Sequence, residues 1–254
     1  MRILILLLLI SFTAGSQTPV FNPVEVQSDV KVQSFTQSNS GFLWIISKHK
    51  LISFNGSENK VHLDSSKLEF TSIHYSGDQE VIFLGTMSGK LIKYSINTKT
   101  VENIRLKNKQ PVSDILSIDG KIFVGTYGDG VYSFTKNLQN INISEKSLKS
   151  PFVYEMMKVD SSRIAIATDR GLYFYNIHTD EYNLIENTPD VIITNLDMSP
   201  DGLLWASTFD NYLFSVHPDN FTVRSYATPD RNKINDICVT TQGIFFSTAE
   251  ALCI

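Results

Sequence analysis

The stretch Asp201-Gly202-Leu203-Leu204-Trp205-Ala206-Ser207-Thr208 decides the fold, because its last six residues recur in five variant copies along the chain. The six copies occupy residues 42–47, 81–86, 121–126, 163–168, 203–208 and 243–248. Their third positions are Trp44, Phe83, Phe123, Ala165, Trp205 and Phe245, at spacings of 39, 40, 42, 40 and 40 residues. So regular a period indicates that one structural unit is repeated six times.

Each copy is the second of four short strand-like segments. An apolar position precedes it by eight to ten residues, and turn residues such as Pro200-Asp201-Gly202 fill the interval, so the two segments form a hairpin. A third apolar run follows, as in residues 171–175, and five copies add a more polar fourth segment, as in residues 100–104. Four strands with their turns use about 40 residues, which is the size of a propeller blade.

A helical solenoid has a similar period, but it needs apolar residues at helical spacing. Here the apolar positions alternate or run continuously over four to six residues, and the middle strands are apolar on both faces. The predicted fold is therefore all-β, a β-propeller of about six four-stranded blades. The blades are expected to start near residues 30, 70, 112, 153, 192 and 234.

The position two residues after each aromatic is small in five copies. The six residues are Ile46, Gly85, Gly125, Ala167, Ser207 and Ser247. We expect an aromatic side chain of the adjacent blade to wedge against the backbone there. Ala165 replaces the aromatic in the fourth copy, and residues 249–251 replace the usual glycine turn in the sixth, so these two blades are expected to pack less well.

The two ends of the chain do not decide whether the ring is closed. The sixth copy stops in its third strand, so the last blade is either incomplete or closed by an N-terminal strand. Pairing of residues 21–26 with residues 251–254 would close the ring and cover an open sheet edge. The alternative is an open ring without a seventh blade.

Residues 1–16 have the pattern of a secretory signal peptide, with Arg2, an apolar run from Ile3 to Ile10, and the small residues Ala14-Gly15-Ser16. The apolar run is about half the length that a membrane-spanning helix requires, so cleavage and export are favoured over anchoring. The propeller then occupies residues 17–254, in the periplasm or outside the cell. No later stretch is long and apolar enough to span a membrane.

Composition limits the classes of function. The 254 residues include 13 Gly and 8 Pro and are 42% hydrophobic, which excludes a disordered or collagen-like chain. The formal net charge is −4, and basic residues are scattered rather than gathered in a stripe. Direct binding to nucleic acid is therefore not expected.

The repeat unit resembles the two-component regulator propeller repeat. The resemblance rests on residues 192–214, which include Asp201-Gly202 and Trp205-Ala206-Ser207-Thr208, and on the same pattern at residues 112–134 and 153–175. In that family such repeats form the periplasmic sensory part of hybrid two-component systems, many of which detect glycan fragments. The resemblance implies a sensory, non-catalytic propeller, present here as a truncated sensor, a fragment or a stand-alone domain.

The sequence offers no recognisable catalytic or metal-binding motif. His49, His62, His74, His178 and His217 lie at irregular intervals, and none has the spacing of a zinc site. Asp129 and Asp210 lie in loops with too few oxygen ligands for calcium. No phosphate loop, nucleophile elbow or paired carboxylates appear. We therefore expect no catalytic residue, metal or cofactor.

Cys238 and Cys253 are the two cysteines of the chain. They fall on the first and third strands of the sixth copy, separated by two strand spacings, or about 9.6 Å. A disulfide cannot reach across that distance. We therefore expect two buried, unpaired thiols.

The candidate binding residues come from the loops between second and third strands, which meet on one face around the channel of a propeller. These loops differ most between copies and mix aromatic with charged residues, a combination suited to a sugar. The candidates are Lys48, His49, Tyr127, Asp129, Asp169, Arg170, Phe209 and Asp210. The alternative is that they are solvent-exposed loop residues that vary freely.

The expected function is recognition of an oligosaccharide, or of a receptor or periplasmic protein partner, without catalysis. Two other classes stay open. One is a structural propeller that mediates protein contacts in the periplasm, and the other is a secreted propeller hydrolase or lyase, because this fold also hosts enzymes.

Overall fold

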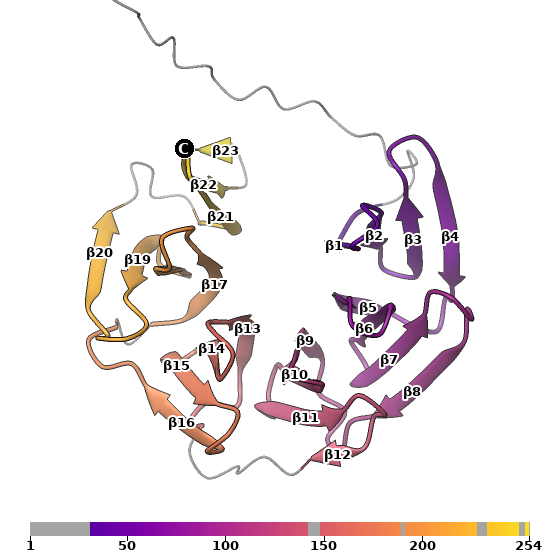
Figure 1. Ribbon diagram of the computed structural model, residues 1–254, viewed down its shortest axis with the longest axis horizontal. Helices are drawn as coiled ribbons and strands as arrows, with labels where there is room; N and C mark the ends of the chain where they lie inside the picture. Colours follow the sequence, from indigo (N-terminus) through magenta and orange to yellow (C-terminus); the bar gives the residue numbers. More distant parts are fainter. Residues whose placement is uncertain (1–30, 142–147, 189–190, 228–232, 249–251, 254) are drawn as a thin grey trace, which may run out of the picture.

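The computed structural model describes residues 31–141, 148–188, 191–227, 233–248 and 252–253. All regular secondary structure in these residues is β-strand, so the described part contains no helix that could cross a membrane. The strands form six antiparallel sheets that stand side by side around a common centre (Figure 1). The predicted all-β propeller is confirmed.

Within each sheet the strands follow one another from the centre outward. The first three sheets contain β1 (Ser34–Gln37), β2 (Leu43–Ile46), β3 (Lys50–Phe54) and β4 (Asn59–Asp64); β5 (Phe70–Ser76), β6 (Val81–Thr86), β7 (Lys90–Ser95) and β8 (Val101–Arg105); and β9 (Val112–Ile118), β10 (Lys121–Thr126), β11 (Val131–Thr135) and β12 (Asn140–Ile141). The other three contain β13 (Val153–Lys158), β14 (Arg163–Thr168), β15 (Gly171–Asn176) and β16 (Glu181–Leu184); β17 (Ile193–Met198), β18 (Leu204–Thr208), β19 (Tyr212–Val216) and β20 (Val223–Ala227); and β21 (Asp236–Thr240), β22 (Gly243–Ser247) and β23 (Leu252–Cys253).

The hydrophobic core is divided into layers between adjacent sheets. Trp44 of the first sheet lies in one cluster with Phe70 and Ile73 of the second. Val81 and Phe83 of the second sheet lie in another cluster with residues of the third, and the same arrangement recurs up to the sixth sheet. Each middle strand of the second to fifth sheets is thus covered by a neighbouring sheet on both faces, which explains why it is apolar on both. In β6 all six residues are buried.

The small residue two positions after the aromatic allows the next sheet to approach the backbone of the second strand. A Cβ atom on Gly85 would lie 2.4 Å from Cγ1 of Val112, and one on Gly125 would lie 2.7 Å from Cγ1 of Val153. The side chain that wedges against these glycines is thus a valine at the start of the next inner strand. The prediction of an aromatic wedge is wrong at these two positions, where the β-branched side chain fills the narrower gap near the channel.

The fourth sheet keeps its aromatic layer although Ala165 replaces the aromatic of the second strand. Ala165 pairs across the strands with Phe174, and both residues are buried. In the third and fifth sheets the pairing is reversed, since Phe123 pairs with Ser133 and Trp205 with Ser215. The aromatic has moved to the neighbouring strand, so the expected loss of packing in this blade is not observed.

Charged side chains join adjacent sheets at the end opposite the loops between second and third strands. Nη1 of Arg163 on β14 donates to the carbonyl of Pro218 at 2.6 Å, and Nη2 donates to Asp219 at 2.9 Å. Nζ of Lys121, at the equivalent place on β10, donates to the carbonyl of Ile177 at 3.0 Å. Each cation thereby connects its own sheet to the third-to-fourth strand loop of the next.

The sixth sheet stands apart from the first sheet in Figure 1. Residues 21–26 lie outside the described residues, so their predicted pairing with the end of the chain stays a prediction. Cys238 on β21 is unpaired, as expected, but it is exposed. The prediction of a buried thiol is wrong for Cys238. No described sheet packs against the face of the sixth sheet that is turned away from the fifth sheet. The side chain of Cys253 lies outside the described part.

Candidate functional site

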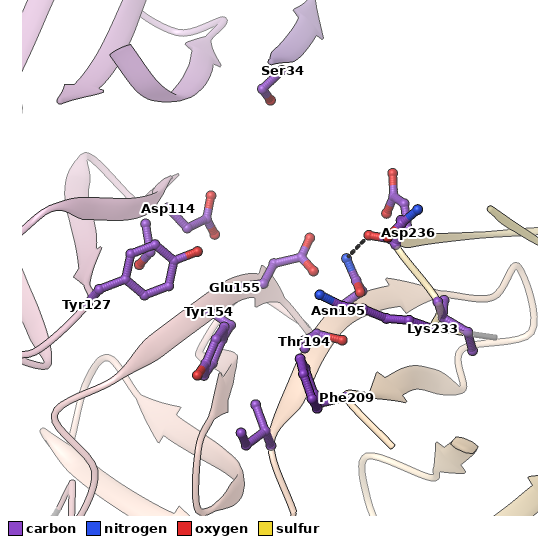
Figure 2. A pocket seen from close by; sticks show the side chains of 14 residues that line it. Ser34, Asp114, Tyr127, Tyr154, Glu155, Thr194, Asn195, Phe209, Lys233 and Asp236 are labelled. Atoms are coloured by element: carbon purple, nitrogen blue, oxygen red, sulfur yellow. Dashed lines mark hydrogen bonds between the residues drawn. The ribbon is translucent and has the colours of Figure 1, made fainter. Parts of the chain in front are cut away.

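A cavity of about 510 Å³ opens at the centre of the propeller, at the end where the second-to-third strand loops emerge. Its walls come from the third to sixth sheets, with Ser34 of the first sheet on the far side. Figure 2 shows Glu155 in the middle of this wall, with Asp114 and Tyr127 on one side and Asp236 on the other. The cavity is thus formed by several blades.

The cavity floor consists of the residues at one equivalent position of the inner strands, in five of the six sheets. The residue at this position pairs with the small position of the second strand, and it is polar in all six sheets. The six residues are Ser34, Ser72, Asp114, Glu155, Asn195 and Asp236. All except Ser72 line the cavity.

A β-bulge explains how two neighbouring residues of one inner strand reach the cavity. The pairing register shifts between Val153 and Glu155 on β13, and it shifts at the same place on β5, β9 and β17. Because the bulged residue is left out of the ladder, strict alternation is lost and Tyr154 and Glu155 both face the channel.

The floor residues also join neighbouring blades. Oδ2 of Asp114 accepts a hydrogen bond from the backbone N–H of Met156 at 2.7 Å, and Oε2 of Glu155 accepts one from Leu196 at 2.7 Å. In the next sheet Nδ2 of Asn195 donates to the carbonyl of Asn235 at 3.1 Å, as drawn in Figure 2. These bonds hold the carboxyl groups in fixed positions at the channel.

Burial disfavours negative charge at two floor residues, Asp114 and Glu155, while Asp236 is more exposed. Burial raises the pKa of the Asp114 carboxyl to about 6, although hydrogen bonds from Met156 and Ile115 oppose the shift. Burial, followed by the charge of Asp114, raises the pKa of Glu155 well above its ordinary value. Burial and Asp197 also raise the pKa of Asp236. The cavity therefore concentrates carboxyl groups that gain from a cation or a hydrogen-bonding ligand.

Aromatic rings form two parts of the rim. The rings of Tyr127 and Tyr154 meet edge to face, with centroids 5.6 Å apart. Phe209 lies on the rim contributed by the fifth sheet and is 49% exposed, with Nζ of Lys233 at 4.8 Å from its ring centroid. These exposed faces can stack against a flat apolar surface such as one side of a sugar ring.

Of the eight residues expected at the mouth, Tyr127 and Phe209 line this cavity. The other six lie outside it, and five of them contact a segment that connects two blades. For Lys48 and His49 this segment follows their own blade, and for Asp129, Asp169 and Arg170 it precedes their own blade. Lys48 pairs with Glu69 at 3.4 Å, and Nδ1 of His49 lies 2.7 Å from the carbonyl of Leu68. Arg170 donates to the carbonyl of Lys149.

The acidic candidates have local partners as well. Asp129 accepts hydrogen bonds from Asn108 and from the hydroxyl of Tyr132, and Asp169 accepts one from Ser150. Asp210 is exposed to solvent. At the first loop position, Tyr127 and Phe209 thus line the cavity, whereas Lys48 and Asp169 bind local partners outside it.

Sequence reasoning missed the floor residues Asp114, Glu155, Asn195 and Asp236. A signal for them was present, because each is a polar residue two positions after an apolar residue of an inner strand and one position before another. Among the described residues no group of three or more His, Cys, Asp or Glu side chains has the arrangement of a metal site.

No protein-family model and no curated protein matches the chain. Solved structures do match. The extracellular domain of BT4673 from B. thetaiotaomicron, a proposed hybrid two component system, has a TM-score of 0.74 at 17% identity, and the match covers 91% of this chain and 33% of that one. The corresponding domain of BT3049 from the same organism has a TM-score of 0.67 at 18% identity, covering 88% of this chain and 34% of that one.

These matches establish a shared fold. The present chain spans about a third of the length of both extracellular domains. A third match is virginiamycin B lyase from Staphylococcus aureus, with a TM-score of 0.75 at 15% identity, covering 87% of this chain and 78% of the lyase. The same architecture thus occurs in sensor domains and in an enzyme.

Proposed function

We propose that this chain is a sensory propeller that works outside the cytoplasm and binds a glycan fragment in its central cavity. The observation that carries the proposal is the combination of exposed rings at Tyr127 and Phe209 with the polar floor between them. Aromatic faces take the apolar side of a sugar ring, while fixed carboxyl and amide groups bind its hydroxyls.

The likeness to extracellular domains of proposed two-component systems supports both the sensory role and the location. The leader-like residues 1–16 support export independently. In a receptor of this kind, occupancy of the propeller would be passed to an output domain. The ligand-binding step proposed here is the part that the cavity can perform by itself.

We further propose that binding occurs without catalysis, although the lyase match raises the alternative. The carboxyl groups of Asp114 and Glu155 have raised pKa values, which is also a property of general acids. However, each carboxyl accepts a hydrogen bond from the backbone of the next blade, which assigns it a structural task. Unchanged glycan after long incubation, followed by NMR, is the expected result, and turnover would favour the enzyme.

The test is calorimetric titration of the protein with a panel of oligosaccharides. Tyr127→Ala and Phe209→Ala should each weaken binding by about tenfold, because each removes one stacking surface. Met87→Ala is the matched control, since Met87 is equally exposed at the same loop position of the second sheet and does not line the cavity. A glycan that binds both aromatic variants as tightly as it binds the wild type, or a panel without any binder, would contradict the proposal.

A further inference from the structure

We infer that the central cavity selects a glycan unit that carries a positively charged amino group. This inference rests on the proposed function and specifies its ligand. The relevant geometry is a cavity in which three carboxyl groups, those of Asp114, Glu155 and Asp236, share one space with exposed aromatic rings.

The carboxyl groups are positioned to receive a cation. Glu155 uses Oε2 for the hydrogen bond from Leu196, and within the described residues no donor pairs with Oε1. Figure 2 shows this carboxyl group pointing into the open part of the cavity, between Asp114 and Asp236. An ammonium group placed there would gain charge-assisted hydrogen bonds without displacing the bonds that join the blades.

The charges of the lining are unbalanced. Lys233 is the one basic side chain among the lining residues, against the three carboxyl groups. Its ammonium already lies against an aromatic face, 4.8 Å from the centroid of Phe209, so it marks a place where the cavity accommodates such a group. A second ammonium, from a ligand, would find the carboxyl groups and the rings of Tyr127 and Tyr154 at the other end.

The same features argue against the other charge classes of sugar. An acidic sugar would bring a carboxylate next to three carboxyl groups and would disfavour their ionisation, whereas an ammonium group favours it. A neutral sugar can stack on the rings, but it leaves the excess negative charge of the floor uncompensated. An amino sugar satisfies both the rings and the carboxyl groups.

The test compares three disaccharides of matched shape by calorimetry at about pH 6.5, where an amine is protonated. They are the β-1,4-linked glucosamine disaccharide, its di-N-acetyl form and cellobiose. We expect the free amino form to bind at least about tenfold more tightly than the other two. Equal affinities, or tighter binding of the N-acetyl form, would overturn the inference and leave the proposed function standing.

Variants separate the charge effect from folding. An ammonium group favours the ionised form of Glu155. Glu155→Gln keeps an acceptor for the N–H of Leu196 but cannot ionise, so the preference for the amino form should fall by about tenfold. Lys233→Met removes the competing ammonium and should strengthen binding of the amino form. Asp129→Asn is the control, because Asp129 is a carboxylate at the same end of the propeller that accepts a hydrogen bond, from Asn108 at 2.7 Å, but does not line the cavity.

If Glu155→Gln and Asp129→Asn reduce the preference equally, the charge of the cavity floor is not its cause, and the inference fails. If none of the three disaccharides binds while another glycan of the panel does, the inference fails and the proposed function stands. If no glycan binds at all, both fail.

Discussion

Asp114 on β9 accepts a hydrogen bond from the backbone N–H of Met156 on β13, and the two strands belong to adjacent blades. Glu155 repeats the contact one blade further on, toward Leu196. The side chains that line the channel are therefore the same ones that connect the inner strands. A ligand bound there, as we propose, would contact the side chains that set the spacing of the blades, so binding could change that spacing.

Asp114→Asn should stabilise the protein at neutral pH. Because the pKa of Asp114 is raised to about 6, the folded state binds more protons than the unfolded state between about pH 4 and 6. Its contribution to stability therefore falls as pH rises through this window. Asparagine can still accept the hydrogen bond from Met156, and we expect a gain of about 1–2 kcal/mol at neutral pH.

Urea unfolding at about pH 4 and pH 7.5 checks this expectation. The gain should shrink at the lower pH, where wild-type Asp114 is protonated. Asp114→Ala is the control, because it removes the acceptor and should destabilise at both pH values. A gain from Asp114→Asn that is the same at both pH values would contradict the account.

Gly85→Ala should destabilise the protein by about 1–3 kcal/mol through overpacking. A Cβ atom at this position would lie 2.4 Å from Cγ1 of Val112 and 2.3 Å from Oγ of Ser72. The measurement is a double-mutant cycle with Val112→Ala, which removes one of the two clashing groups. The two changes should be less harmful together than their sum, and strict additivity would show that Val112 is not the neighbour that limits space.

Arg163→Met should cost about 1–3 kcal/mol, because it removes hydrogen bonds to Asp160, Pro218 and Asp219. Arg224→Met is the control, since Arg224 is exposed on β20 and its side chain makes no hydrogen bond or ion pair within the described residues. Thermal unfolding compares the two variants. Equal shifts in Tm would mean that the connection between the fourth and fifth blades contributes little.

Cys238 should react with a thiol reagent in the folded protein, because its side chain is exposed. Partial desolvation of the thiol, followed by the charges of Asp197 and Asp236, raises its pKa, so labelling should be slow near neutral pH and accelerate as pH rises. Asp236→Asn should speed the reaction. Peptide mapping by mass spectrometry identifies the labelled residue, and labelling of Cys238 only after denaturation would show that this face is covered.

The blade pattern was predictable because it depends on local chemistry that each copy repeats. Trp205 with its turn at Asp201-Gly202 specifies a hairpin, and a period of about 40 residues specifies the repeat. The exchange of aromatic and small residue between Ala165 and Phe174 could not be read from single positions, since the compensation lies on the neighbouring strand.

The cavity floor was not predicted because alternation along the inner strand gives the wrong orientation. The bulge before Glu155 turns Tyr154 and Glu155 toward the same channel, and a bulge depends on how two strands pair. The variability of the loops predicted binding residues such as Arg170, which do not line the cavity. A polar residue held between apolar positions of the inner strand, as at Asp114, is the more informative signal in a repeat of this kind.

The measurement that tests the central claim most directly is amide hydrogen exchange with and without the tightest-binding glycan of the panel. Binding in the channel should slow exchange in the inner strands and second-to-third strand loops that form the cavity. These segments are residues 112–116, 127–130, 153–157, 193–197 and 208–211. Exchange in the third-to-fourth strand loops at the opposite end, residues 96–100, 177–180 and 217–222, should not change. Protection confined to those opposite loops or to the outer strands would contradict a ligand site in the central cavity.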